Sequence, residues 1–170
     1  NIMSYPQKQW VPRIESLKAI VGSVIYRRGQ DDLLLLMNTS GQGQHIRIGS
    51  RGEFNNVGTL STLHAKDSVK EWTSLTRRDD SFLIGAANGR VVELIPDSNN
   101  WKEARSWNSW GSQPDHKFGN QIQLAADNRL LWVADSSRHR VLCFSSDGKK
   151  LLASFGQTDT PGNDLDHVHT

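Results

Sequence analysis

A strand–turn–strand pattern recurs three times along this chain, and its spacing limits the possible folds more than any other feature. Each copy has a strand, a polar turn with Asp or Asn, and then a more continuously apolar strand. The copies start at Gly22, Lys70 and Asn120, which are 48 and then 50 residues apart. A fixed period of this length indicates stacked structural units of one kind. The copies span residues 22–38, 70–88 and 120–135.

The second half of each unit adds two more strands, separated by turns rich in Gly, Asn, Asp and Ser. Gly, Asn and Asp are frequent in such turns because tight hairpins require positive φ angles. Four strands in about 40–50 residues are typical of a propeller blade. We therefore predict an all-β fold, a β-propeller of four-stranded antiparallel blades, with about three blades in this chain. Third strands are predicted over residues 45–48, 90–95 and 140–144, and fourth strands over 53–60, 102–107 and 149–155.

The predicted organisation follows this repeat from end to end. Residues 1–20 are expected to be an N-terminal arm or the outer strand of a preceding blade, and residues 157–170 the start of a next blade. The chain begins at Asn1 without an initiator Met or an apolar leader, so we expect a processed, excised or incomplete polypeptide. The predicted blades are residues 21–60, 61–107 and 108–156.

Charge and apolar content argue against several classes of function. Twenty Lys and Arg residues against 18 Asp and Glu residues leave a formal net charge of +2, which is not the footprint of a polyanion-binding protein. The longest apolar run, residues 33–37, is much shorter than the ~20 residues of a membrane span. A single Cys allows no internal disulfide and no Cys-based metal cluster. The Trp- and Asn-rich loops favour an extracytoplasmic or secreted location.

The third unit carries a specific sequence resemblance. It reads LWVADSSRHRV over residues 131–141, FSSDG over 144–148 and FG over 155–156. This unit resembles the NHL repeat, in which a VAD motif and an HRV motif flank the turn between the second and third strands. The first two units lack both motifs and match in spacing and strand pattern alone, so we interpret them as degenerate blades of the same propeller.

The resemblance implies a propeller that usually has six blades, of which this chain would hold about half. A half ring exposes two sheet faces and unpaired strand edges to water, which is unfavourable. We therefore expect a partner that supplies the remaining half of the propeller. This partner is either a second copy of the chain or another polypeptide segment.

In a propeller, the turns between second and third strands and the connections between blades lie on one side, around the mouth of the central channel. We call this side the loop face; propeller ligands usually bind there. Trp101, Trp107 and Trp110 occur close together among amide and hydroxyl side chains, a composition that suits sugar stacking or a protein hot spot. In the alternative interpretation, Trp101 and Trp107 pack between blades and Trp110 is the exposed contact. The predicted ligand-binding residues are Trp107, Trp110, His116, His139 and His64.

The C-terminal segment offers two candidate metal sites. His167 and His169 have the spacing that puts both side chains on one face of a strand. With Asp164 or Asp166 nearby, they could supply two imidazoles and a carboxylate to Zn²⁺. Ordinary surface histidines are the competing interpretation. Oxygen ligands for Ca²⁺ also occur here, but their spacing is not that of an EF-hand loop, and a solvated acidic loop is the favoured interpretation. A divalent metal, Ca²⁺ or Zn²⁺, is thus the one cofactor that the sequence suggests. The oxygen-ligand residues are Asp159, Gly162, Asn163, Asp164 and Asp166.

Two arginine pairs occupy equivalent turns between first and second strands, on the side opposite the loop face, which we call the turn face. Some animal proteins of the NHL type bind RNA through a basic face. Here acidic residues follow both pairs and largely cancel their charge, so nucleic-acid binding is disfavoured. The pairs are Arg27 with Arg28 and Arg77 with Arg78, followed by Asp31 with Asp32 and Asp79 with Asp80.

Three residues of the third unit are interpreted as structural. Asp135 and Arg140 match the VAD and HRV positions, where the resemblance implies a charge-assisted brace of the hairpin. Cys143 lies in the predicted third strand and is expected to be buried and inert.

No local signature of a nucleophilic serine, a zinc protease, a phosphate loop or a dinucleotide site occurs in the sequence. The favoured function is a binding module that presents the loops of the channel mouth to a protein or glycan. The alternative is part of a metal-assisted propeller lyase or hydrolase with histidines at the channel.

Overall fold

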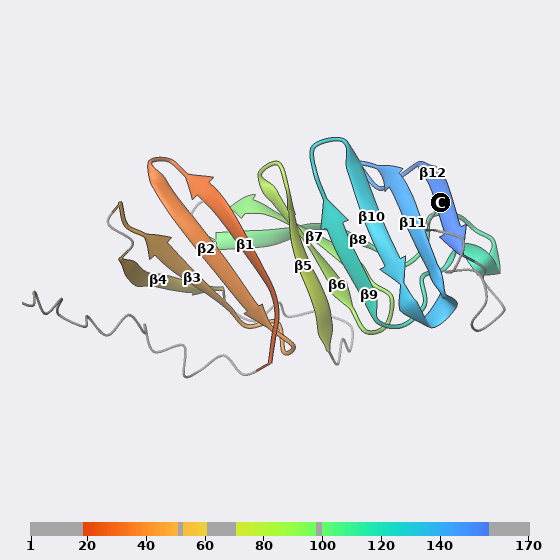
Figure 1. Ribbon diagram of the computed structural model, residues 1–170, viewed down its shortest axis with the longest axis horizontal. Coiled ribbons are helices and arrows are strands. Elements are labelled where there is room, and N and C mark those ends of the chain that lie inside the picture. The colour runs from red at the N-terminus through yellow and green to blue at the C-terminus, as the bar shows by residue number, and fades with distance from the viewer. Residues whose placement is uncertain (1–18, 51–52, 61–70, 98–99, 157–170) are drawn as a thin grey trace, which may run out of the picture.

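The computed structural model describes residues 19–50, 53–60, 71–97 and 100–156. Within these residues, twelve strands form three separate four-stranded antiparallel sheets, each with its strands in sequence order. The predicted all-β architecture of four-stranded antiparallel blades is therefore confirmed. The sheets lie side by side along the molecule as the blades of an open arc (Figure 1).

Each blade is one continuous stretch of chain. The first blade contains β1 (Ile20–Arg28), β2 (Asp31–Asn38), β3 (Gly43–Ile48) and β4 (Phe54–Leu60). The second contains β5 (Trp72–Arg78), β6 (Ser81–Ala86), β7 (Val91–Asp97) and β8 (Asn100–Trp107). The third contains β9 (Ile122–Ala126), β10 (Leu130–Asp135), β11 (Arg140–Ser145) and β12 (Leu151–Gly156). Two short 3₁₀ helices, η1 (Pro114–His116) and η2 (Ser136–Arg138), lie in the connections.

The first strands of the blades are neighbours, because β1 contacts β5 and β5 contacts β9. These are the positions of the innermost strands in a propeller. The turns from β1 to β2, β5 to β6 and β9 to β10 all lie at the upper edge in Figure 1, which is the turn face. The loop face is the lower edge. Among the described residues, no helix is long and apolar enough to cross a membrane.

Apolar side chains between the blades form two cores. In β6 every residue is buried, because this strand lies in the middle blade and both of its faces are covered. Phe82 and Ile84 belong to the core between the first and second blades, whereas Leu83 belongs to the core between the second and third. The continuous apolar run in β6 therefore reflects a strand that is sandwiched on both sides.

A glycine turn lets two segments of the loop face approach each other closely. Gly89, in the turn from β6 to β7, has a φ of 75°. A Cβ atom at this position would lie 2.3 Å from the carbonyl oxygen of Gly119, in the connection between the second and third blades. Only glycine permits both this backbone conformation and this approach. The close contact holds the inter-blade connection against the second blade.

We expect Leu83→Ala to lower the free energy of unfolding by about 2–4 kcal/mol, because the side chain is fully buried between two blades and its loss leaves a cavity. Lys149→Ala, at an exposed position, is the control and should change it by less than ~0.5 kcal/mol. Urea unfolding followed by circular dichroism measures both. Equal small effects would show that the blade interface is not tightly packed.

Candidate functional site

A buried ion pair anchors the loop face of the third blade. The guanidinium of Arg140 donates from Nε and Nη2 to Oδ2 of Asp135, at 3.1 and 3.0 Å. Both residues are buried. A buried charge is stable only when it is paired and hydrogen-bonded, and this pair meets that requirement. The pair braces the hairpin of β10 and β11 at its loop-face end.

The same pair also fixes the connection between the second and third blades. Arg140 donates to the carbonyl oxygens of Asp115 and Lys117, at 2.8 and 2.6 Å. Asp135 accepts the N–H of Gly119 at 3.1 Å on each carboxylate oxygen. Three backbone groups of this connection thus converge on one ion pair. The position of this connection on the loop face therefore depends on Asp135 and Arg140.

Trp110 lies in a packed layer on this connection. Its ring stacks on His116, with centroids 5.1 Å apart, and the Arg140 guanidinium lies 4.8 Å from the Trp110 ring centroid. Phe118 and Phe144 contact the same indole. Trp110 is half-buried against the core of the second and third blades, so much of the surface that the sequence suggested for ligand contact is used for packing.

Trp107 lines a cleft on the loop face with a volume of about 330 Å³. The cleft lies between the turn from β6 to β7 and the end of β8. The Arg105 guanidinium lies 4.4 Å from the Trp107 ring centroid. A Cβ atom at Gly148 in the third blade would be 3.2 Å from the same ring, so the indole is held between two blades. The cleft is lined by Asn88, Arg90, Ser106, Trp107 and Asn108.

The polar groups of this loop-face cleft are arranged by one arginine. Arg90 donates to Oγ of Ser106 at 2.8 Å and to a carboxylate oxygen of Glu103 at 3.1 Å. Its backbone N–H donates to Oδ1 of Asn88 at 3.1 Å. The cleft thus combines amide, hydroxyl and guanidinium groups with one aromatic ring. This composition suits a ligand rich in hydroxyl groups.

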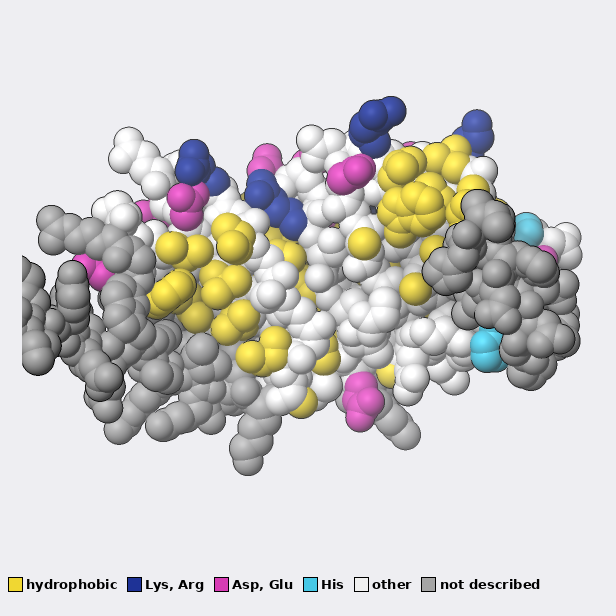
Figure 2. Space-filling view, in the orientation of Figure 1, with side chains coloured by type: hydrophobic (Ala, Val, Ile, Leu, Met, Phe, Trp, Pro, Cys, Tyr) yellow, Lys and Arg dark blue, Asp and Glu magenta, His cyan; other side chains and the backbone are white. Residues whose placement is uncertain are grey.

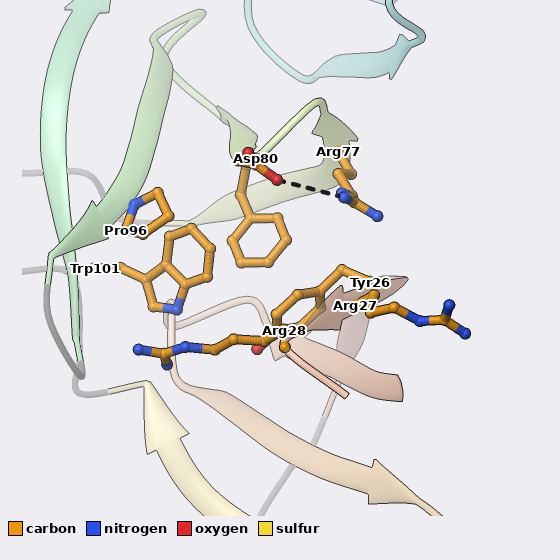
Figure 3. Close-up of a pocket in the computed structure, with 9 residues that line it drawn as sticks. Tyr26, Arg27, Arg28, Arg77, Asp80, Pro96 and Trp101 are labelled. Atoms are coloured by element: carbon orange, nitrogen blue, oxygen red, sulfur yellow. Dashed lines mark ion pairs between the residues drawn. The ribbon is translucent and has the colours of Figure 1, made fainter. Parts of the chain in front are cut away.

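A second cleft of about 260 Å³ opens on the turn face between the first and second blades (Figure 3). Tyr26, Phe82 and Trp101 form its aromatic wall, with Phe82 and Trp101 centroids 4.2 Å apart and Tyr26 and Phe82 centroids 5.1 Å apart. Trp101 therefore packs between two blades, which is the alternative that the sequence left open. The cleft is lined by Tyr26, Arg27, Arg28, Gly29, Arg77, Asp80, Phe82, Pro96 and Trp101.

Two arginines of this turn-face cleft form ion pairs with neighbouring aspartates. Arg27 donates to both carboxylate oxygens of Asp32, at 2.8 and 3.2 Å. Arg77 lies 3.8 Å from the carboxylate of Asp80, the ion pair drawn in Figure 3, and donates to the carbonyl oxygen of Asp79. Arg90 of the loop-face cleft also has an acidic partner, Glu103, so ion pairing does not separate the two clefts. The loop-face cleft is the stronger candidate because it lies on the face that the sequence predicted for ligands.

Arg78 has a different role from its neighbour Arg77. It forms an ion pair with Glu93 and donates to the carbonyl oxygen of Ser146 in the third blade. Glu93 also accepts from Arg105 at 2.6 Å. Burial acts to raise the pKa of Glu93, but the hydrogen bond from Arg105 and the charges of both arginines outweigh it and hold the pKa below its usual value. These residues connect the second and third blades.

The sequence did not identify His45 as important. Its Nδ1 lies 2.6 Å from the hydroxyl of Tyr26, which donates to the ring when this nitrogen is unprotonated. Burial, with a smaller contribution from the charge of Arg28, lowers the pKa of His45 to about 4. This histidine lies inside β3, whereas the sequence analysis considered histidines of the loop face. The alternation of apolar and polar residues in β3 was the sequence signal that could have placed His45 on one face of the blade.

Several predicted site residues fall outside the described residues. These are His64, His167, His169 and Asp166, together with the oxygen-ligand residues of the C-terminal segment. His139 is exposed and has a φ of 50°, which closes the turn after η2. Cys143 is buried. In the part of the chain that the structure describes, no group of three or more His, Cys, Asp or Glu residues is placed to hold a metal ion.

Comparisons with known proteins support the fold, but not a family, a ligand or an activity. No protein-family model matches the sequence, and no curated protein sequence matches it significantly. The structure is similar to Saccharomyces cerevisiae Sqt1, with a TM-score of 0.56 and 13% identity over 84% of this chain. It is also similar to Myxococcus xanthus glutaminyl cyclase, with a TM-score of 0.52 and 13% identity over 81% of this chain. The likeness shows a β-propeller fold. The chain spans 37% and 50% of the lengths of these two proteins.

We expect Asp135→Asn to lower the free energy of unfolding by about 3–5 kcal/mol, because it leaves the buried Arg140 guanidinium without its counter-charge. Asp115→Asn is the matched control, since this side chain is exposed, and it should cost less than ~0.5 kcal/mol. Urea unfolding measures both. A loss below ~1 kcal/mol in Asp135→Asn would contradict the bracing role.

We expect stability to fall as the pH decreases from about 6.5 toward 4. His45 has its pKa near 4 in the folded chain and near the usual 6.5 when unfolded, so the unfolded chain binds more protons in this interval. The contribution is about 1–2 kcal/mol, because the ring is partly solvated. Urea unfolding at pH 7 and pH 4.5, with His45→Gln as comparison, should show a smaller pH effect in the variant. The same pH effect in both proteins would refute this.

Proposed function

We propose that this chain is part of an NHL-like β-propeller binding module that presents its loop face to a protein or glycan ligand. The observation that carries the proposal is the loop-face cleft beside Trp107, with its amide, hydroxyl and guanidinium groups. Aromatic rings stack on the apolar faces of sugars, while such polar groups hydrogen-bond to sugar hydroxyls. This composition favours a glycan over a protein surface.

The NHL resemblance adds a reason for the position of the cleft. The repeat motifs place Asp135 and Arg140 where they brace the connection between the second and third blades. That connection continues directly from Trp107 and Asn108. A rigid support behind a binding loop lowers the entropy that must be lost on binding. In this proposal the motif residues are supports, and the cleft residues contact the ligand.

The proposed module is completed by the remaining half of the propeller, from a second copy of the chain or another polypeptide segment. The alternative, a metal-assisted lyase or hydrolase, depends on His64, His167 and His169, which lie outside the described residues. His116 is stacked against Trp110. The described residues therefore offer more support for binding than for catalysis.

A glycan array probed with the labelled protein tests the proposal, followed by calorimetric titration of the best oligosaccharide. Asn108→Ala removes an exposed cleft amide and should weaken binding about 5–10-fold, the value of one hydrogen bond. Trp107→Ala should weaken binding further, and circular dichroism should show that this variant, whose indole packs between two blades, is folded. Asn128→Ala, at an exposed position in a turn of the turn face, is the matched control and should bind normally.

Two results would contradict the proposal. One is the absence of binding to every glycan on the array and to every protein in a pull-down. The other is glycan binding that Asn108→Ala and Trp107→Ala both leave unchanged, since the ligand would then occupy another part of the molecule.

A further inference from the structure

The turn-face cleft combines an aromatic floor with a partly accessible aromatic side chain. Tyr26 and Phe82 form the floor and are 5% and 1% exposed, so their rings are fixed in the core between the first and second blades. Trp101 packs on both, with its ring centroid 6.0 Å from that of Tyr26 and 4.2 Å from that of Phe82, but it is only half-buried. Pro96, which is exposed, also lines the cleft. Part of the Trp101 side chain is therefore accessible to a ligand.

The arrangement of these rings favours a flat ligand. The planes of Tyr26 and Phe82 meet at 82°, those of Tyr26 and Trp101 at 80°, and those of Phe82 and Trp101 at 39°. A flat aromatic ligand would extend this cluster, because rings in edge-to-face or offset contact gain energy beyond the apolar area that they bury. The cleft volume of about 260 Å³ is slightly below the usual range for drug-sized ligands, which indicates a ligand of one or two fused rings.

The rim of the cleft carries more positive than negative charge. Three arginines and one carboxylate, that of Asp80, are among the lining residues. Figure 2 shows Lys and Arg side chains projecting along the turn face, and in Figure 3 the side chain of Arg28 extends toward Trp101. Burial raises the pKa of the Tyr26 hydroxyl, whereas the charges of Arg28 and Arg77 act in the opposite direction. Positive charge from two blades thus reaches the floor of the cleft.

Two of the arginines differ in how firmly they hold their aspartates. Arg27 donates to both carboxylate oxygens of Asp32, a bidentate pair. Arg77 lies 3.8 Å from the carboxylate of Asp80, which is too long for a hydrogen bond, and the Asp80 side chain is 92% exposed. Nε of Arg77 donates to the carbonyl oxygen of Asp79 at 2.6 Å, which holds the guanidinium at the cleft. A ligand anion can therefore replace Asp80 beside Arg77 at little cost.

We propose that the turn-face cleft is a second binding site, which takes a small flat aromatic anion: one or two fused rings that carry a carboxylate or a phosphate. The rings contact Trp101 above the floor formed by Tyr26 and Phe82, and the anionic group binds the guanidinium of Arg77. This site goes beyond the proposed function, because it lies on the opposite face from the loop-face cleft and takes a different class of ligand.

Titration of the purified chain with 2-naphthoate tests the proposal, with the indole N–H signal of Trp101 followed by NMR. A Trp101→Phe variant assigns this signal among those of the six tryptophans. We expect the signal to shift and saturate. 2-Naphthamide has the same rings without the charge and should bind about 10-fold more weakly. 2-Naphthyl phosphate is the second arm: the tighter of the two anions shows whether the site favours a phosphate or a carboxylate.

Two charged side chains of the rim should change the affinity in opposite directions. Arg77→Gln removes the guanidinium and should weaken 2-naphthoate binding about 10-fold. Asp80→Asn removes the competing carboxylate and should strengthen it about 3-fold. The matched controls remove the same charges elsewhere: Arg129→Gln on the turn face of the third blade, and Glu71→Gln at the loop-face end of β5. Both controls are at exposed positions and should bind 2-naphthoate normally.

Three results would overturn the inference: no shift of the Trp101 signal with either anion at about 10 mM, equal affinity for 2-naphthoate and 2-naphthamide, or an affinity that neither Arg77→Gln nor Asp80→Asn changes. A general loss of structure would weaken binding in both variants, so opposite changes exclude it. Asn108→Ala, which alters the loop-face cleft, should bind 2-naphthoate normally. This site and the proposed function are therefore confirmed or refuted separately.

Discussion

A four-stranded blade has two apolar faces, and no blade of this chain can bury both by itself. This constraint explains most of the structure. Phe82 and Leu83 are adjacent in sequence, yet they belong to different cores on opposite sides of β6. Burial on both sides explains why the middle blade has a second strand without polar residues at its centre.

Polar interactions hold the blades and loops at fixed positions once the faces are buried. Glu93 receives hydrogen bonds from Arg78 and Arg105, and both arginines also reach the third blade. Asp135 and Arg140 perform the same task at the loop face, where they attach the inter-blade connection to a hairpin. Each arginine offers several donors in a fixed plane, so one side chain can bind a carboxylate and a carbonyl of another segment at once.

The blades were predictable from sequence because the repeat period and turn residues are local signals. The pairing of Asp135 with Arg140 followed from the NHL resemblance, whereas their contacts with the connection near Asp115 and Lys117 depend on how two segments meet in space. From the sequence, Arg77 and Arg78 were interpreted as one surface pair. Because side chains alternate along a strand, the two residues point to opposite faces and contact different partners. Trp110 illustrates the same limit. Its place in a loop suggested exposure, whereas the packing of His116 and Phe118 around it leaves it half-buried.

Because blades pack only on their neighbours, the free energy of local opening differs along the arc. A blade contacts only the blades beside it, so the stability of the arc is close to a sum of blade and junction contributions. Among the described residues, the middle blade has two junctions and each terminal blade has one. Local opening should therefore begin at the ends and reach β6 last, and amide hydrogen exchange should be slowest in the strands around Leu83. The loop-face cleft lies on this middle blade, so its residues are attached to the part of the arc that opens least.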